Sequence, residues 1–346
     1  MTWFENLTGV EEDSPEIVRE AFELDGEWLT SRVNGRCWRV GRLQTPSLGE
    51  LRQRVAGLYD RDHAGGLRIS ERVADVRDLH ADPDNAGAMF QAASQFNLLE
   101  MMHPEIRPEH GIGGYERDRT QGPACAIACG AGTIYRNYLV EVDGQRGQDR
   151  HRQIDCLADV GRVLGNRDNR LWEMRNGYAL ASEEGLREIA DLLAGADEDA
   201  LDGLRSRLRI GMQWDTEVTL PGAGHTVSQA YCAALPVAYG LPAAELWAPF
   251  ARLVLEAAYE AVFCAARLNR ARTGNDTLFL TMLGGGAFGN RDEWIADAIV
   301  RAAGIHAGCG LDVRIVSYGR PQVGVARTMD RVTRASRLAG SGGLMI

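Results

Sequence analysis

Four glycines and one aromatic residue lie at the junction between an apolar run and a stretch of helical periodicity. The segment reads Leu278-Phe-Leu-Thr-Met-Leu-Gly-Gly-Gly-Ala-Phe-Gly-Asn290, and its first half predicts a strand covered on both faces. The apolar spacing after it predicts a helix. Free N–H groups at a helix start attract anions, and glycine lets the backbone approach a ligand. The pattern predicts a diphosphate cradle made of Gly284, Gly285, Gly286, Ala287, Phe288, Gly289 and Asn290. A ligand-free strand-to-helix turn explains the glycines equally well.

This glycine loop belongs to neither of the two common phosphate-binding motifs. It lacks the terminal Lys-Ser/Thr of a P-loop, and its glycines do not have the dinucleotide-binding spacing. All 38 residues counted as Lys+Arg are arginine. The absence of lysine from the sequence excludes a lysine Schiff base, a P-loop lysine and a lysine general base.

A second group of polar residues could act on a glycosidic bond. Glu100 lies within the apolar run 98–102, which suggests a buried carboxylate with a raised pKa, although one solvated side of a helical turn fits as well. Asp118 is the next carboxylate near the expected site, and neutral hydrogen-bonding groups come from Gln95, Asn97, Thr120 and Gln121. Such groups could protonate a leaving group or activate water. Thr120 and Gln121 could equally cap the helix that follows.

Composition narrows the classes of function. The chain has 346 residues, is 45% hydrophobic and carries a net charge of −10. These values indicate a globular protein and argue against extended nucleic-acid binding, which needs a basic face. No run is apolar enough to span a membrane and no secretion signal is evident, so we expect a cytoplasmic protein without a membrane partner. We expect no cofactor.

The seven cysteines are scattered, and most lie in apolar segments, which favours reduced core thiols. Cys125 and Cys129 are one helical turn apart, but no second pair completes a zinc site, so we expect no metal. A Cys–His hydrolase with Cys125 as nucleophile and His225 as base is an alternative enzyme class. The residues after Cys125, Ala-Ile-Ala-Cys, are typical of packing instead.

Strands and helices are expected to alternate along most of the chain. Strands are predicted near 67–76, 88–94, 225–239, 277–283 and 311–318, and helices from Pro123, over 243–269 and after Asn290. This alternation predicts an α/β protein with a mixed sheet in three α/β/α layers. Ligands then bind at the carboxyl ends of the strands, where Asp75, the segment 91–100 and the glycine loop all lie.

We expect three regions. Residues 1–60 form an N-terminal extension packed on the core, and residues 61–320 form the α/β/α domain. An insertion occupies about 141–213, with amphipathic stretches at 184–194 and 200–208. Residues 321–346, rich in Arg, Gly and Ser, are expected to form a flexible tail.

The order of these elements resembles a macrodomain, the ADP-ribose-binding α/β/α fold, over roughly residues 67–320. The resemblance rests on Val73-Ala-Asp-Val-Arg-Asp-Leu79, Phe90-Gln-Ala-Ala-Ser-Gln-Phe-Asn97, His225-Thr-Val and the glycine loop. It implies that Asp75, beside Val76, holds the adenine amino group and that the glycines hold the diphosphate. It also implies that Phe288 packs on the distal ribose, and that Asn97 and Glu100 face the bond to be cut.

Two departures from that family concern the chemistry. Leu98-Leu-Glu-Met-Met-His-Pro104 follows Asn97 where hydrolytic macrodomains have glycines, and the paired glutamates of poly(ADP-ribose) glycohydrolases are not evident. The sequence therefore leads to a protein that binds ADP-ribose or a related nucleotide and hydrolyses an ADP-ribosyl linkage. Its partner would be ADP-ribose or an ADP-ribosylated substrate. A non-catalytic ADP-ribose reader is the alternative.

Overall fold

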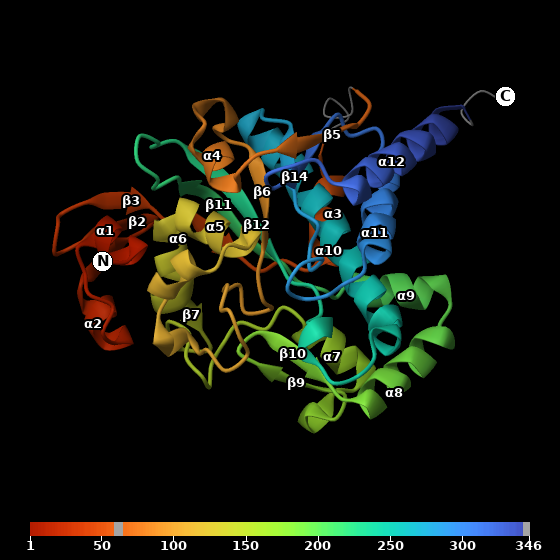
Figure 1. Ribbon diagram of the computed structural model, residues 1–346, viewed down its shortest axis with the longest axis horizontal. Helices are drawn as coiled ribbons and strands as arrows, with labels where there is room; N and C mark the ends of the chain where they lie inside the picture. Colours follow the sequence, from red (N-terminus) through yellow and green to blue (C-terminus); the bar gives the residue numbers. More distant parts are fainter. Residues whose placement is uncertain (59–64, 342–346) are drawn as a thin grey trace.

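A seven-stranded mixed sheet forms the centre of the protein (Figure 1). The computed structural model describes residues 1–58 and 65–341, and the sheet order within them is β4-β11-β12-β6-β13-β14-β5. Strands β12, β6, β13, β14 and β5 are parallel, whereas β11 is antiparallel to both of its neighbours. In sheet order the strands are Arg42–Gln44, Gly211–Glu217, Thr226–Cys232, Met89–Ala93, Thr277–Leu280, Asp312–Ser317 and Arg68–Val73.

Helices cover both faces of this sheet. One side carries α4 (Val76–Ala81), α5 (Gln121–Ala128) and α6 (Gly130–Ile134). The other carries α3 (Leu48–Ala56), α10 (Ala244–Thr273), α11 (Asp292–Ile305) and α12 (Val323–Ser341). The predicted three-layer α/β/α class is confirmed. No helix among the described residues has the length and apolar character needed to cross a membrane.

The strand-to-helix junctions agree closely with the sequence pattern. Strand β5 ends at Val73, and Asp75 caps helix α4 by accepting a hydrogen bond from the N–H of Arg77. Strand β13 ends at Leu280, and α11 begins at Asp292 with two acidic residues in its first turn, as helix termini favour. Each junction places its loop at the same edge of the sheet, because the strands are parallel.

Two helices and a small sheet precede strand β4 of the central sheet, and helix α3 follows it. The helices are α1 (Trp3–Thr8) and α2 (Pro15–Glu20), and the antiparallel strands are β1 (Phe22–Asp25), β2 (Trp28–Ser31) and β3 (Cys37–Arg39). Strand β4 pairs with β11 at the edge of the central sheet. A second hydrophobic cluster joins Phe4 and Leu7 to Leu99, Met101 and Tyr138. The boundary expected between residues 60 and 61 lies outside the described residues.

The region 141–213 contains more regular structure than its polar composition suggests. Its elements are β7 (Glu141–Val142), β8 (Gln145–Arg146), α7 (Ala158–Leu164), β9 (Trp172–Arg175), β10 (Tyr178–Ala181), α8 (Glu183–Ala194) and α9 (Glu198–Arg205). The two amphipathic stretches match α8 and α9. Strand β11, which begins at Gly211, belongs to the central sheet and was not predicted.

The prediction of a flexible tail at 321–346 is wrong for most of that segment. Helix α12 occupies Val323–Ser341 and packs against α11. Val325 and Val332 are almost fully buried and lie seven residues apart, so they share one face of the helix. The Arg-, Gly- and Ser-rich composition masked this apolar stripe. Residues 342–346 lie outside the described part of the chain.

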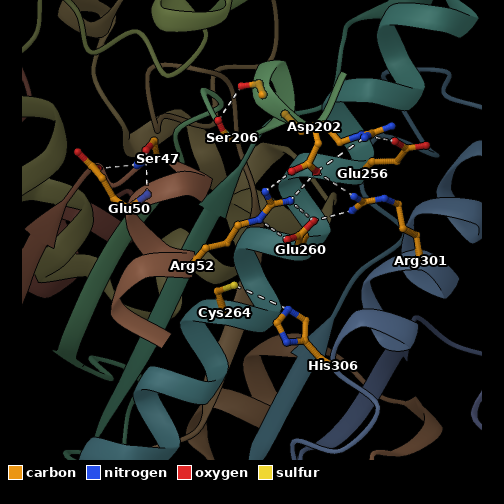
Figure 2. A network of polar contacts seen from close by, with 12 residues as sticks. Ser47, Glu50, Arg52, Asp202, Ser206, Glu256, Glu260, Cys264, Arg301 and His306 are labelled. Carbon is orange, nitrogen blue, oxygen red and sulfur yellow. Dashed lines mark hydrogen bonds and ion pairs between the residues drawn. The ribbon is translucent and has the colours of Figure 1, made fainter. Parts of the chain in front are cut away.

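A network of arginines and carboxylates joins the N-terminal region and the insertion to the core (Figure 2). Arg52 of α3 binds Glu260 of α10 at 2.5 Å and Asp202 of α9 at 2.6 Å. Arg301 of α11 binds the same two carboxylates, at 2.5 Å and 3.3 Å. Glu260 is only 2% exposed. Four helices from three parts of the chain therefore meet at one charged centre.

Candidate functional site

Two neighbouring pockets open at the carboxyl ends of the parallel strands. The first, the glycine-loop pocket, has a volume of about 270 Å³ and is lined by residues following β6, β12 and β13, together with Glu100 and Phe288. The second, the Asp75 pocket, has a volume of about 470 Å³ and is lined by residues following β5 and β14. Both are lined by Asp118, Thr120, Gln121 and Thr281. This is the edge at which open α/β sheets bind ligands.

Glu100 lies in the wall of the glycine-loop pocket, and its local fold explains how it gets there. A turn closes here: the N–H of Leu98 donates to the carbonyl of Gln95 at 2.9 Å, the N–H of Gln95 donates to the carbonyl of Leu99 at 2.9 Å, and Leu98 lies in the left-handed region at φ 64°. The side chain of Gln95 then accepts a bond from the N–H of Met101 at 2.8 Å and donates one to its carbonyl at 3.2 Å. The Tyr115 hydroxyl accepts the N–H of Glu100 at 2.9 Å. The backbone at Glu100 and Met101 is therefore held by the side chains of Tyr115 and Gln95.

The carboxyl group of Glu100 is buried and carries an unusual charge state. The residue is 2% exposed, and neither carboxyl oxygen has a hydrogen-bond partner among the described residues. Burial raises the pKa of Glu100 to about 8, against the lowering effect of Arg136, whose Nη2 lies 3.6 Å from Oε1. Glu100 is thus largely protonated at neutral pH. The raised pKa expected from its apolar neighbours is present in the structure.

Helix α5 brings its first turn against Glu100, and only glycine fits at one position. A Cβ on Gly122 would lie 1.9 Å from the carbonyl oxygen of Ala93 and 3.2 Å from Cγ of Glu100. The side chain of Gln121 bonds the carbonyl of Gln91 at 2.7 Å and the N–H of Ala93 at 2.9 Å. The end of β6 and the start of α5 are therefore locked together at the pocket.

Gly122→Ala is expected to destroy this junction. The added methyl must push α5 away from β6, because the obstructing atom is backbone, and overpacking of this kind costs about 1–3 kcal/mol. We expect a lower urea midpoint and displaced amide resonances of Gln95 to Met101. Gly114→Ala is the matched control, since apart from its chain neighbours no described residue places an atom within 4 Å of a Cβ there. Equal urea midpoints and unchanged spectra in both variants would contradict the proposed fit.

The glycine loop has a pocket-facing side and a structural side. Gly284, Gly286, Ala287 and Phe288 line the pocket. The amide of Asn290 bonds the carbonyls of Leu235 at 2.8 Å and Gly284 at 3.3 Å, so Asn290 braces the loop. Gly285, Gly289 and Asn290 are not part of the pocket lining, and Gly289 is needed for its left-handed φ of 72°.

Three aromatic rings pack beside the loop. The centre of the Tyr178 ring lies 5.3 Å from that of Phe288 and 5.1 Å from that of Tyr239. The ring centres of Tyr239 and Phe288 are 5.5 Å apart. All three line the glycine-loop pocket. The Tyr178 hydroxyl donates to the carbonyl of Met101 at 2.5 Å, so β10 of the insertion is bonded to the segment that holds Glu100. The sequence reasoning missed both tyrosines: Tyr178 lies in the predicted insertion, and Tyr239 ends the predicted strand 225–239, to which no site residue was assigned.

Asp75 and Val76 lie in the second pocket. The carboxylate of Asp75 is bound by the guanidinium of Arg77 at 2.8 Å, and this hydrogen bond lowers its pKa. Asp75 therefore stays ionised at neutral pH and can accept a hydrogen bond from a ligand.

The other expected polar residues divide into two groups. Gln95, Asp118, Thr120 and Gln121 line the glycine-loop pocket, although the amides of Gln95 and Gln121 are occupied by backbone groups. Asn97 lines neither pocket. It is fully buried, donates to Gln153 at 2.9 Å and accepts the N–H of Leu99 at 3.1 Å, so it shapes the turn before Glu100.

The alternative Cys–His site is not supported by this geometry. Cys125 is fully buried in α5 and is absent from the lining of both pockets, and burial raises the pKa of its thiol well above the ordinary value. A nucleophilic cysteine needs the opposite, a lowered pKa and access to a ligand.

Comparison with known proteins adds similarities of structure only. No family model and no curated protein matches the sequence. Poly(ADP-ribose) glycohydrolase from Thermomonospora curvata is 15% identical with a TM-score of 0.44, and the match covers 96% of this chain and 98% of that one. The Deinococcus radiodurans glycohydrolase in complex with ADP-ribose is 13% identical with a TM-score of 0.46, covering 85% and 93%. Similarity at this level assigns no activity to this chain.

Proposed function

We propose that this protein binds ADP-ribose, or a closely related nucleotide, across the two pockets and hydrolyses an ADP-ribosyl linkage. The observation that carries the proposal is the position of Glu100 in the wall of a pocket that the glycine loop also lines. Its buried carboxyl group has no hydrogen-bond partner among the residues that the structure describes. The resemblance of the sequence to macrodomains supplies the choice of ligand.

The two pockets suit the two ends of such a ligand. The ionised Asp75 would accept a hydrogen bond from the adenine amino group in its pocket. Gly284 and Gly286 would approach the diphosphate, and Phe288 would pack on the distal ribose. Asp118, Thr120, Gln121 and Thr281 line both pockets, so a single ligand could extend from one into the other.

The charge state of Glu100 supports its role as a general acid. As the bond between the anomeric carbon and the leaving oxygen breaks, protonated Glu100 would transfer its proton to that oxygen. Water would add to the anomeric carbon, and Asp118, a partly exposed carboxylate in the same pocket, would accept the water proton. A non-catalytic reader would need the cradle but no buried acid, so Glu100 favours the hydrolase.

Calorimetric titration with ADP-ribose tests the binding proposal. We expect saturable binding that weakens at least tenfold in Gly286→Leu. Gly286 lines the pocket, and apart from its chain neighbours no described residue places an atom within 4 Å of a Cβ there, so the added side chain would compete with a ligand for space. Gly114→Leu, equally unobstructed and outside the pocket, should bind like the unmodified protein. The absence of binding heat at millimolar ADP-ribose would reject the proposal. Binding without turnover of ADP-ribosylated protein would instead support the alternative, a non-catalytic ADP-ribose reader.

A further inference from the structure

Arg136 is completely buried beneath Glu100 and lies outside the lining of both pockets. Its Nε donates to the carbonyl of Leu98 at 3.0 Å, and its Nη2 donates to the Thr133 hydroxyl at 3.1 Å. The same Nη2 lies 3.6 Å from Oε1 of Glu100. At this distance the guanidinium attracts the ionised carboxylate strongly, because the dielectric constant of the interior is low, but the two atoms are too far apart for a good hydrogen bond. The carboxyl group thus keeps its hydrogen-bonding capacity for a ligand.

A buried polar chain holds the guanidinium in this position. The guanidinium carbon lies 3.7 Å from the centre of the Tyr231 ring, a cation–π contact. The Tyr231 hydroxyl donates to the side-chain oxygen of Gln229, and the Gln229 amide lies 3.0 Å from Nε2 of His80. His80 lies 2.7 Å from the carbonyl of Val76 through Nδ1. The chain runs from Arg136 to the first turn of α4, where Val76 lines the Asp75 pocket.

We propose that Arg136 positions Glu100 and controls its charge state from beneath the pocket, without touching the ligand. Arg136 would limit how strongly burial neutralises Glu100, so that the group can both give up and recover a proton near neutral pH. Its catalytic significance depends on the function proposed above. The electrostatic coupling itself can be measured without any activity.

Among the ionisable groups around Glu100, Arg136 is the charged group that opposes the effect of burial on the pKa of Glu100. Tyr115 faces Glu100 from the turn Gly113–Arg117, Cys125 from α5 and Tyr231 from β12. Burial raises the pKa of each of these three groups well above its ordinary value, so all are neutral below pH 8. Arg136 is the cation among the groups that act on Glu100.

Carbon-13 NMR of the glutamate side chains tests the proposal, with the Glu100 signal assigned from Glu100→Gln. In the unmodified protein we expect the Glu100 carboxyl carbon to titrate above pH 7, and the Arg136 Nε signal to shift with the same midpoint. In Arg136→Met the Glu100 midpoint should rise by about one unit or more, since a nearby opposite charge lowers a carboxyl pKa by about 1–3 units. In Arg136→Lys, which keeps the charge, it should rise less.

The outcomes separate coupling from a purely structural role. A folded Arg136→Met variant with an unchanged Glu100 midpoint would overturn the proposal. If that variant fails to fold, the unmodified protein still decides, because an Arg136 Nε signal that stays constant while Glu100 titrates would also overturn it. These readouts stand even if calorimetry shows no ADP-ribose binding, so failure of the proposed function and failure of this inference are distinguishable.

Discussion

Glu100→Gln is expected to reduce hydrolysis of an ADP-ribosylated protein by about 10²–10⁴-fold, the usual contribution of general acid catalysis. Glutamine keeps the shape of the side chain, but its amide protons are not acidic enough to be transferred to the leaving oxygen. Calorimetry should give an ADP-ribose affinity within about twofold of the unmodified protein. Release of ADP-ribose, followed under single-turnover conditions, measures the loss.

The control for this prediction is Glu105→Gln. Glu105 is a nearby exposed carboxylate whose partner is Arg175, and it lies outside both ligand pockets. Its replacement should leave turnover unchanged. Unchanged turnover in Glu100→Gln would remove Glu100 from the mechanism, whereas loss of both turnover and affinity would indicate a binding role.

The pH dependence follows from the raised pKa of Glu100, about 8. The acid form predominates below this value, so turnover should fall as the pH rises through it. Stability has the same sign, since a group whose pKa is raised in the folded state contributes stability at low pH that is lost as the pH rises. The free energy of unfolding of the unmodified protein should therefore fall, relative to that of Glu100→Gln, as the pH rises from about 4.5 to about 8, with no further change above that.

Glu260→Gln is expected to cause the largest loss of stability, about 2–3 kcal/mol, because it leaves two partly buried arginines facing a neutral group. Arg52 and Arg301 each reach Glu260 at 2.5 Å, and Glu260 is buried on α10. Urea unfolding followed by circular dichroism measures the change in the free energy of unfolding. A variant as stable as the unmodified protein would show that the network contributes nothing.

Glu188→Gln serves as the control. Glu188 forms an exposed ion pair with Arg170, so its replacement should leave the urea midpoint unchanged.

The network of Arg52, Asp202, Glu260 and Arg301 also predicts that stability falls in acid. Burial raises the pKa of Glu260, but hydrogen bonds from Arg52 and Arg301 outweigh burial and leave it lowered, and Arg52 lowers the pKa of Asp202. Both carboxylates contribute stability above their unfolded pKa values of about 4, and this contribution is lost as the pH falls below them.

Sequence reasoning succeeded where local pattern and parallel topology act together. The apolar run before Gly284 predicts a strand, and the acidic residues after Asn290 predict the start of a helix, so the glycine loop lies between them. Because the strands are parallel, their carboxyl ends lie at one edge of the sheet. The apolar neighbours of Glu100 suggested its raised pKa, although they left the solvated side of a helical turn as an equal alternative. Both features depend on residues close together in the chain.

The features that were missed depend on contacts between distant segments. Tyr178 reaches the pocket because β10 folds back onto the segment after β6, and nothing near Tyr178 in the sequence indicates this. Arg136 follows a run of small and apolar residues in α6, so its pairing with Glu100 emerges only when the two segments pack. Asn97 has the residue type of a ligand contact, but the turn that presents Glu100 occupies its amide.

The place of β4 at the sheet edge bears on how the protein could be divided. Its three residues, Arg42–Gln44, pair with β11 and cover that strand's outer backbone groups. A fragment that starts after the N-terminal region would expose the N–H and C=O groups of β11, and an uncovered edge of this kind pairs with other chains and promotes aggregation. The N-terminal region thus supplies the terminal strand of the central sheet, and a fragment without it would lose this pairing.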